Sequence, residues 1–214
     1  MTLTEPFERV FVARYPTQYE LTATFMRLQE FYESPSPAIR RKVLSLEEFM
    51  DAYAAHYGNF DYHTAYTGFN VPGITLGKFF NAYVGRLTRH EDRLFRMLTR
   101  WVPHFWGDAH PYYLVGIFRD EEMDHELAHA FYGLHARYRQ RMDSAVRSRR
   151  DIRRIRAGLR SQGYNAGQYL DEAQAYLATS PSSELRERWG FEPKSCGRIR
   201  TTFREWKDKL AHDA

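Results

Sequence analysis

The segment 124–138 constrains the fold of this chain more than any other, because its pattern fits a single secondary structure. Its apolar residues recur at spacings of four, three and four, which is the period of an amphipathic helix: Leu127, Phe131, Leu134 and Tyr138. His125 and His129 are four residues apart and share another face, about 200° of helical rotation from Leu127. The segment therefore predicts one helix with a packing face and a face that presents two histidines.

Helical patterns dominate the rest of the chain. Two helices begin at capping boxes, Ser45 with Glu48 and Thr88 with Glu91. Other helices are expected over about 17–33, 76–87, 169–178 and 201–210, and a long helical stretch is expected from about 120 through the arginine-rich segment. Strands are expected at 7–14 and 112–118, and a loop with short extended pieces at 59–73. The sequence predicts the α+β class, dominated by helices around a small sheet.

The composition indicates one folded domain over residues 1–214, with a mostly helical N-terminal lobe (1–104) and a second lobe (105–214). Aromatic residues make up 16% of the chain, which excludes a disordered protein. No apolar stretch reaches the length of a membrane span, and the N-terminus lacks the pattern of a secretory signal. The single cysteine, Cys196, excludes an internal disulfide. We therefore expect a cytoplasmic protein, although export without a signal peptide would leave the same pattern.

Positive charge is concentrated in one segment, Arg137–Arg160, which holds ten arginines against two aspartates. The chain as a whole carries +4, so the residues outside this +8 segment carry −4. Any affinity for a polyanion should lie in this segment. An apolar stripe within it predicts a helix with one buried side, so a solvated basic face is the alternative to nucleic-acid binding.

His125, Glu126 and His129 form the pattern H-E-x-x-H. On a helix the two imidazoles can reach one zinc ion, at Zn–N distances of about 2.0–2.1 Å. Glu126 lies next to the first histidine and can act as general base toward a water molecule without binding the metal. The pattern predicts a zinc site, against the alternative of two surface histidines on a core helix.

A catalytic zinc site needs a third protein ligand, and two candidates are open. Glu172 lies on a later expected helix, about forty residues beyond His129, where a second helix can bring a carboxylate back. His135 is the alternative, but on an unbroken helix it would point about 80° from His125 and about 120° from His129. His135 requires the chain to leave the helix before it, which Gly133 would permit. Glu172 is therefore the preferred candidate.

The segment 112–176, with its strand YYLVGIF, the motif HELAH and the later DEAQAY, resembles the zincin metallopeptidases. It is nearer the branch with a glutamate as third ligand, the gluzincins. The resemblance implies a zincin-like fold with an active-site helix carrying HExxH, and Zn²⁺ held by His125, His129 and Glu172 with Glu126 as base. Asp171 and Tyr176 are then candidates for hydrogen bonds that orient a ligand histidine. The metzincin pattern differs, because Tyr132 stands where that pattern has glycine.

These residues predict a zinc-dependent metallohydrolase of the peptidase type that acts on a peptide or protein. Hydrolysis also needs a donor for the developing oxyanion, and four residues are candidates: Tyr132, His135, Tyr169 and Tyr176. Two other classes of function remain open. One is a nucleic-acid-associated protein that uses the basic helix, and the other is a non-catalytic zinc-binding protein. A structural zinc site usually has a fourth ligand such as cysteine, and Cys196 is the one cysteine available.

Overall fold

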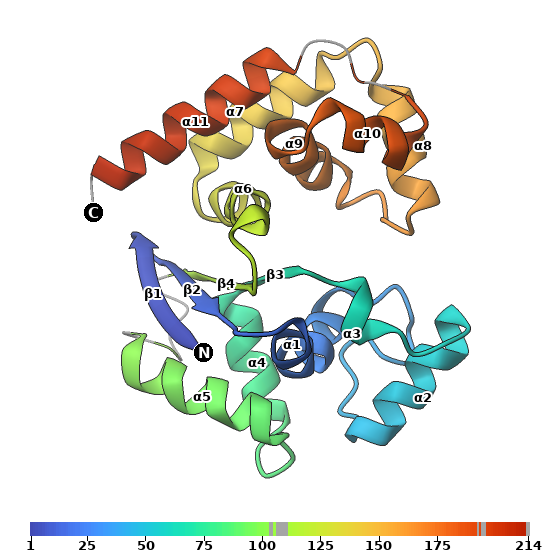
Figure 1. Cartoon of the computed structure of the whole chain (residues 1–214), viewed down its shortest axis with the longest axis vertical. Helices are drawn as coiled ribbons and strands as arrows, with labels where there is room; N and C mark the ends of the chain where they lie inside the picture. The colour runs from blue at the N-terminus through green and yellow to red at the C-terminus, as the bar shows by residue number, and fades with distance from the viewer. Residues whose placement is uncertain (103–104, 106–110, 192, 194–195, 213–214) are drawn as a thin grey trace. The chain divides into compact units, whose positions relative to one another are not determined.

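The computed structural model describes residues 1–102, 105, 111–191, 193 and 196–212. The chain forms two compact units (Figure 1), Met1–Glu5 with Arg9–Glu122 and Pro6–Glu8 with Met123–Ala214, which we call unit 1 and unit 2. The boundary lies at Glu122 rather than near residue 104, because the strand after residue 111 belongs to the sheet of unit 1.

The described residues of unit 1 form a four-stranded mixed sheet with five helices. Its elements in chain order are β1 (Thr2–Phe7), β2 (Val10–Arg14), α1 (Gln18–Glu33), α2 (Leu46–Tyr57), α3 (Tyr62–Ala65), β3 (Gly68–Pro72), α4 (Gly73–Ala82), α5 (Arg89–Trp101) and β4 (Tyr113–Ile117). The strand order is β1-β2-β4-β3, in which β2 runs parallel and β3 antiparallel to β4. A 3-10 turn, η1 (Asp120–Glu122), ends the unit.

Two expectations for this unit need correction. Residues 7–14 do not form one strand, because Arg9 adopts a left-handed conformation (φ 64°) that separates β1 from β2. The segment 59–73 contains β3, one of the short extended pieces expected within a loop, but it also contains the helix α3, which was not expected. The predicted strand at 112–118 is confirmed as β4, and both predicted capping boxes are present, at Ser45 and Thr88.

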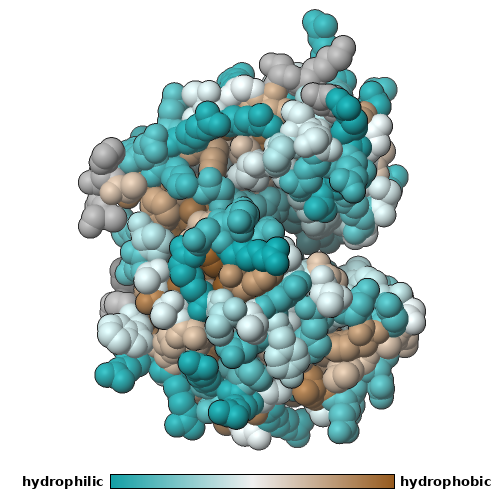
Figure 2. All heavy atoms as spheres, in the orientation of Figure 1, coloured by the Kyte–Doolittle hydropathy of each residue, from teal (hydrophilic) through white to brown (hydrophobic). Residues whose placement is uncertain are grey.

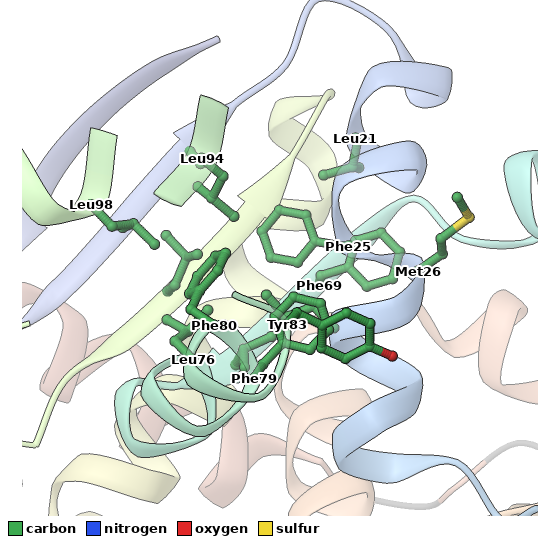
Figure 3. Close-up of a cluster of buried hydrophobic side chains, with 14 of the residues drawn as sticks. Leu21, Phe25, Met26, Phe69, Leu76, Phe79, Phe80, Tyr83, Leu94 and Leu98 are labelled. Carbon is green, nitrogen blue, oxygen red and sulfur yellow. The ribbon is translucent and has the colours of Figure 1, made fainter. Parts of the chain in front are cut away.

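The core of unit 1 is aromatic and lies between the sheet and its helices. Figure 3 shows Phe25 of α1 beside Phe69 of β3, and the two rings stack with their centroids 5.1 Å apart. Gly116 of β4 permits this packing, because a Cβ atom there would lie 2.6 Å from the Phe25 ring. The cluster also includes apolar residues from α4, from its C-cap position and from α5, which are labelled in Figure 3: Leu76, Phe79, Phe80, Tyr83, Leu94 and Leu98.

Unit 2 is helical apart from the end of β1. Its helices are α6 (Met123–Leu134), α7 (Ala136–Arg147), α8 (Ile152–Ser161), α9 (Tyr169–Thr179), α10 (Ser182–Trp189) and α11 (Gly197–His212). The long helix expected from residue 120 is instead broken at His135, which is extended between α6 and α7, and α10 was not expected from the sequence. The helix-dominated α+β class is confirmed.

The apolar side of α6 forms the core of unit 2. Phe131 is fully buried and packs against Phe7 and Phe203, with ring centroids 5.3 and 6.1 Å away. Hydrophilic residues predominate on the visible surface of unit 2 in Figure 2. None of the described helices has the length and apolar character of a membrane span.

Candidate metal centre

The two histidines of α6 converge on one point. The Nε2 atoms of His125 and His129 lie 3.3 Å apart. Two ligands of a tetrahedral zinc ion at Zn–N distances of 2.0–2.1 Å are separated by about 3.3–3.4 Å. The spacing of four residues has therefore placed both nitrogens at the separation that a shared metal ion requires.

The second helix of the site, α9, packs against α6 and supplies a carboxylate. Glu172 is buried, and its Oε2 atom lies 3.9 Å from Nε2 of His129. Ligand atoms of His125, His129 and Glu172 all lie within 4.8 Å of one another. Two imidazoles and one carboxylate are the donor set of several catalytic zinc sites, so these residues fit a zinc ion in both chemistry and approximate spacing.

Asp171 orients His129. Its Oδ1 atom lies 2.9 Å from Nδ1 of His129, so the ring donates from Nδ1 and directs the lone pair of Nε2 toward His125. A carboxylate behind a ligand histidine is the usual means by which proteins fix the tautomer of that ring. The sequence prediction that Asp171 lies beside a ligand histidine agrees with this contact.

Two buried residues hold Asp171 in turn: Tyr138, which the sequence placed on the apolar face of its helix, and Gln174, to which the sequence gave no separate role. Gln174 donates from Nε2 to Oδ1 of Asp171 (3.2 Å) and to the carbonyl of Ala128 (3.1 Å). Tyr138 donates to Oε1 of Gln174 at 2.9 Å. Gln174 is one helical turn after Asp171, and a fully buried glutamine is unusual, but burial is not visible in a single sequence.

His125 is held by Thr179, which the sequence reasoning also missed. The Thr179 hydroxyl donates to the carbonyl of Ala175 (2.8 Å), so it can only accept from Nδ1 of His125, at 3.4 Å. With both Nδ1 atoms used as donors, the two Nε2 atoms face each other and can share a cation, either a proton on His129 or a metal ion. A cation between His125 and His129 stabilises that arrangement.

Charges around the site shift the two imidazole pKa values in opposite directions. Burial, with contributions from His129 and Arg188, holds the pKa of His125 well below its usual value. Burial also acts to lower the pKa of His129, but Asp171, Glu172 and Glu126 raise it well above its usual value. Without a metal ion the site therefore holds a proton on His129 beside a neutral His125, and its local excess of negative charge favours a cation.

Glu126 lies on α6 between the two histidines in sequence and is 6% exposed. Its charge contributes to the raised pKa of both His129 and Tyr176. Glu126 is a neighbour of the converging ligand atoms in sequence but is not part of that group.

Tyr176 packs against the first ligand, with its ring centroid 4.7 Å from that of His125. Its hydroxyl receives a hydrogen bond from Nη1 of Arg188 (3.2 Å) and lies 3.1 Å from the hydroxyl of Tyr164. Burial and the Glu172 charge raise the pKa of Tyr176 to about 12, although Arg188 opposes the shift. The Tyr176 hydroxyl therefore keeps its proton at neutral pH.

The other candidates lie elsewhere in unit 2. The break in the helix that His135 needed does occur, but its ring packs against Phe131 and Trp206, at centroid distances of 6.1 and 5.6 Å. The hydroxyl of Tyr132 donates to Asp143. Among the described residues, His125, His129 and Glu172 are the one group of three that could hold a metal ion.

Tyr169 and Cys196 are also outside this group. The hydroxyl of Tyr169 receives a hydrogen bond from Nε of Arg160 at 3.3 Å. Cys196 is buried next to the start of α11, with Sγ 4.0 Å from the carbonyl of Pro193. A fourth protein ligand, which a structural zinc site would need, is thus not supplied by cysteine.

Comparison of the chain with protein-family models, with curated proteins and with solved structures found no match. The function is therefore argued from the geometry of the site.

Proposed function

We propose that this protein is a zinc-dependent metallohydrolase of the peptidase type, with a gluzincin-like arrangement of His125, His129 and Glu172. The convergence of these three ligand groups, with Asp171 behind His129, is the observation that carries the proposal. The absence of a cysteine from the group favours a catalytic site over a structural one.

Zinc held by these residues would polarise a substrate carbonyl and lower the pKa of a water molecule toward about 7. Glu126 would accept the proton of that water and pass it to the leaving amine, as a general base and then a general acid. Its burial suits this role, because bulk water does not compete with the reacting water for the carboxylate.

Tyr176 is the preferred donor for the oxyanion that develops on the substrate carbonyl. It packs against His125 and keeps its proton at neutral pH, and the hydrogen bond that it accepts from Arg188 does not use that proton, whereas Tyr132 donates its proton to Asp143. A hydrogen bond that strengthens in the transition state typically contributes about 10²–10³ in rate when the donor is well placed.

We also propose a reducing, cytoplasmic setting and a peptide or protein substrate. The single cysteine, Cys196, is buried and unpaired, which is compatible with such a compartment.

Metal analysis and turnover together test the proposal. The purified chain should hold about one zinc ion, and His125→Ala or His129→Ala should lose it. Glu126→Gln should keep the zinc, because Glu126 is not a ligand, while cleavage of a broad peptide library falls by about 10²–10⁴.

Equal and negligible zinc in wild type and in both histidine variants would refute the metal site. Zinc binding without any Glu126-dependent cleavage would identify a metal-binding protein and refute the proposed hydrolase activity. Loss of zinc from Glu126→Gln would show that Glu126 is a ligand and that its assigned role is wrong.

A further inference from the structure

The arginine-rich segment separates into two groups in the structure. One group has protein partners: Arg139 donates to backbone carbonyls, Arg147 and Arg149 pair with aspartates, Arg154 lies over Phe191, and Arg160 donates to Tyr169. The other group is exposed and makes no hydrogen bond or ion pair with any residue that the structure describes: Arg137, Arg141, Arg150, Arg153 and Arg156. Contacts within the protein therefore account for five of the ten arginines and give no structural role to the other five.

One of the exposed arginines lines a pocket between two helices. Helices α7 and α11 lie side by side (Figure 1), and the pocket between them has a volume of about 350 Å³. It is lined by Arg141, Arg198, Thr201, Thr202 and Glu205. Two guanidinium groups and two hydroxyls can all donate hydrogen bonds, and Glu205 is the one acidic residue among them. This set of donors suits a phosphate group.

The opposite sides of α7 and α8 are buried. Met142, Val146, Ile155 and Leu159 are fully buried, as the apolar stripe in the sequence predicted. A helix that binds a membrane surface inserts large apolar side chains below the headgroups, and the one large apolar residue of α7 and α8 that is not fully buried, Ile152, is half-buried. Their exposed side is dominated by arginine, which favours the phosphate backbone of a nucleic acid over a lipid surface.

A duplex fits this surface better than a single strand. Proteins that hold single strands stack the bases on exposed aromatic rings. Tyr138 is the one aromatic residue of α7 and α8, and it is fully buried.

We propose that unit 2 binds the backbone of double-stranded nucleic acid, with one phosphate in the pocket between α7 and α11. The exposed arginines of α7 and α8 add further contacts to neighbouring phosphates. Binding of this kind is independent of base sequence and falls steeply with salt, because each neutralised phosphate releases condensed counterions. The inference does not depend on the metal site.

Fluorescence anisotropy of a labelled duplex, titrated with the full chain at several salt concentrations, tests the proposal. Arg141→Gln with Arg198→Gln removes both pocket guanidiniums. Because the pocket holds one phosphate, this double variant should reduce the magnitude of the slope of log K against log salt by about 1 and weaken binding about tenfold near 0.1 M salt. Glu205→Gln should strengthen binding, because it removes the one acid from the pocket.

Arg96→Gln with Arg100→Gln is the matched control, because both arginines are exposed on α5 of unit 1 and the change in net charge is the same. Circular dichroism and zinc content should be unchanged in every variant. Equal losses in the two double variants would mean a net-charge effect and overturn the assigned pocket. No duplex binding at low salt, or binding to phosphatidylserine vesicles in its place, would overturn the proposal.

Discussion

The hydrogen bond between Asp171 and His129 offers a direct test of the proposed metal site. Asp171 accepts through Oδ1 from Nδ1 of His129 at 2.9 Å and from Nε2 of Gln174 at 3.2 Å. Asp171→Ala removes both contacts and leaves His129 free to rotate or to change tautomer. Asp171→Asn keeps an oxygen that can accept from the same two donors but removes the charge.

The expected magnitude follows from the role of Asp171 as the partner of one ligand. Loss of the partner of a metal-ligating histidine typically costs 10–100-fold in metal affinity. We expect Asp171→Ala to weaken zinc binding by about that factor, or about 1.4–2.7 kcal/mol. The loss of zinc affinity in Asp171→Asn should lie at the lower end of this range, because this variant loses only the additional strength that charge gives to the hydrogen bond.

Competition with a chromophoric chelator, at neutral pH and with metal-free protein, measures this affinity. Asp124→Asn is the control: it makes the same charge change one residue before His125, at a carboxylate that pairs with Lys207 at 2.5 Å. Unchanged zinc affinity in Asp171→Ala would refute the reasoning. An equal loss in Asp124→Asn would show that the effect is general electrostatics rather than orientation of His129.

Further predictions concern the third ligand and the stability of unit 1. Glu172→Ala should weaken zinc binding far more than His135→Ala, because the His135 ring packs in the core; the reverse ranking in the chelator assay would identify a three-histidine site. Glu91→Ala should lower the free energy of unfolding by about 3–5 kcal/mol, since it leaves the buried guanidinium of its ion pair uncompensated. Glu48→Ala should lower the free energy of unfolding much less in chemical denaturation, because Glu48 belongs to an equivalent capping box that is exposed. Equal losses of unfolding free energy in the two variants would contradict this account. Burial raises the pKa of Glu30 above its usual value of 4.5, so the folded state favours the neutral acid and loses stability as pH rises through the interval above 4.5. Glu30→Gln should therefore raise the melting temperature more at pH 7 than at pH 4, and a gain that is independent of pH would refute the assignment.

The sequence was most informative where the determining interactions are local. Both capping boxes, at Ser45 and Thr88, formed as predicted because all their partners lie within four residues. The two histidines of α6 share a face for the same reason, since helical geometry fixes the relation between residues i and i+4. The apolar side of that helix is buried at Leu127 and Phe131, as the spacing predicted.

Elements defined by non-local contacts were predicted less well. β3 was expected as no more than a short extended piece within a loop, because its sequence is short and rich in turn-forming residues, and its strand conformation depends on pairing with β4, 41 to 49 residues later. The break at His135 was foreseen as a possibility through Gly133, but its position and the direction of the ring depend on packing against Trp206 of α11. Local propensity contains no information about such partners.

The candidate site shows the same difference between local and non-local determinants. The sequence by itself determined that His125 and His129 would present their rings on one face of a helix with Glu126 beside them, because those relations are set by 3.6 residues per turn. Only the tertiary structure decided that Glu172 joins them, since that requires α9 to pack on α6 in one register. The supporting contacts from Gln174 and Thr179 depend on the same packing, because side chains more than forty residues apart meet only when the helices that carry them are held together.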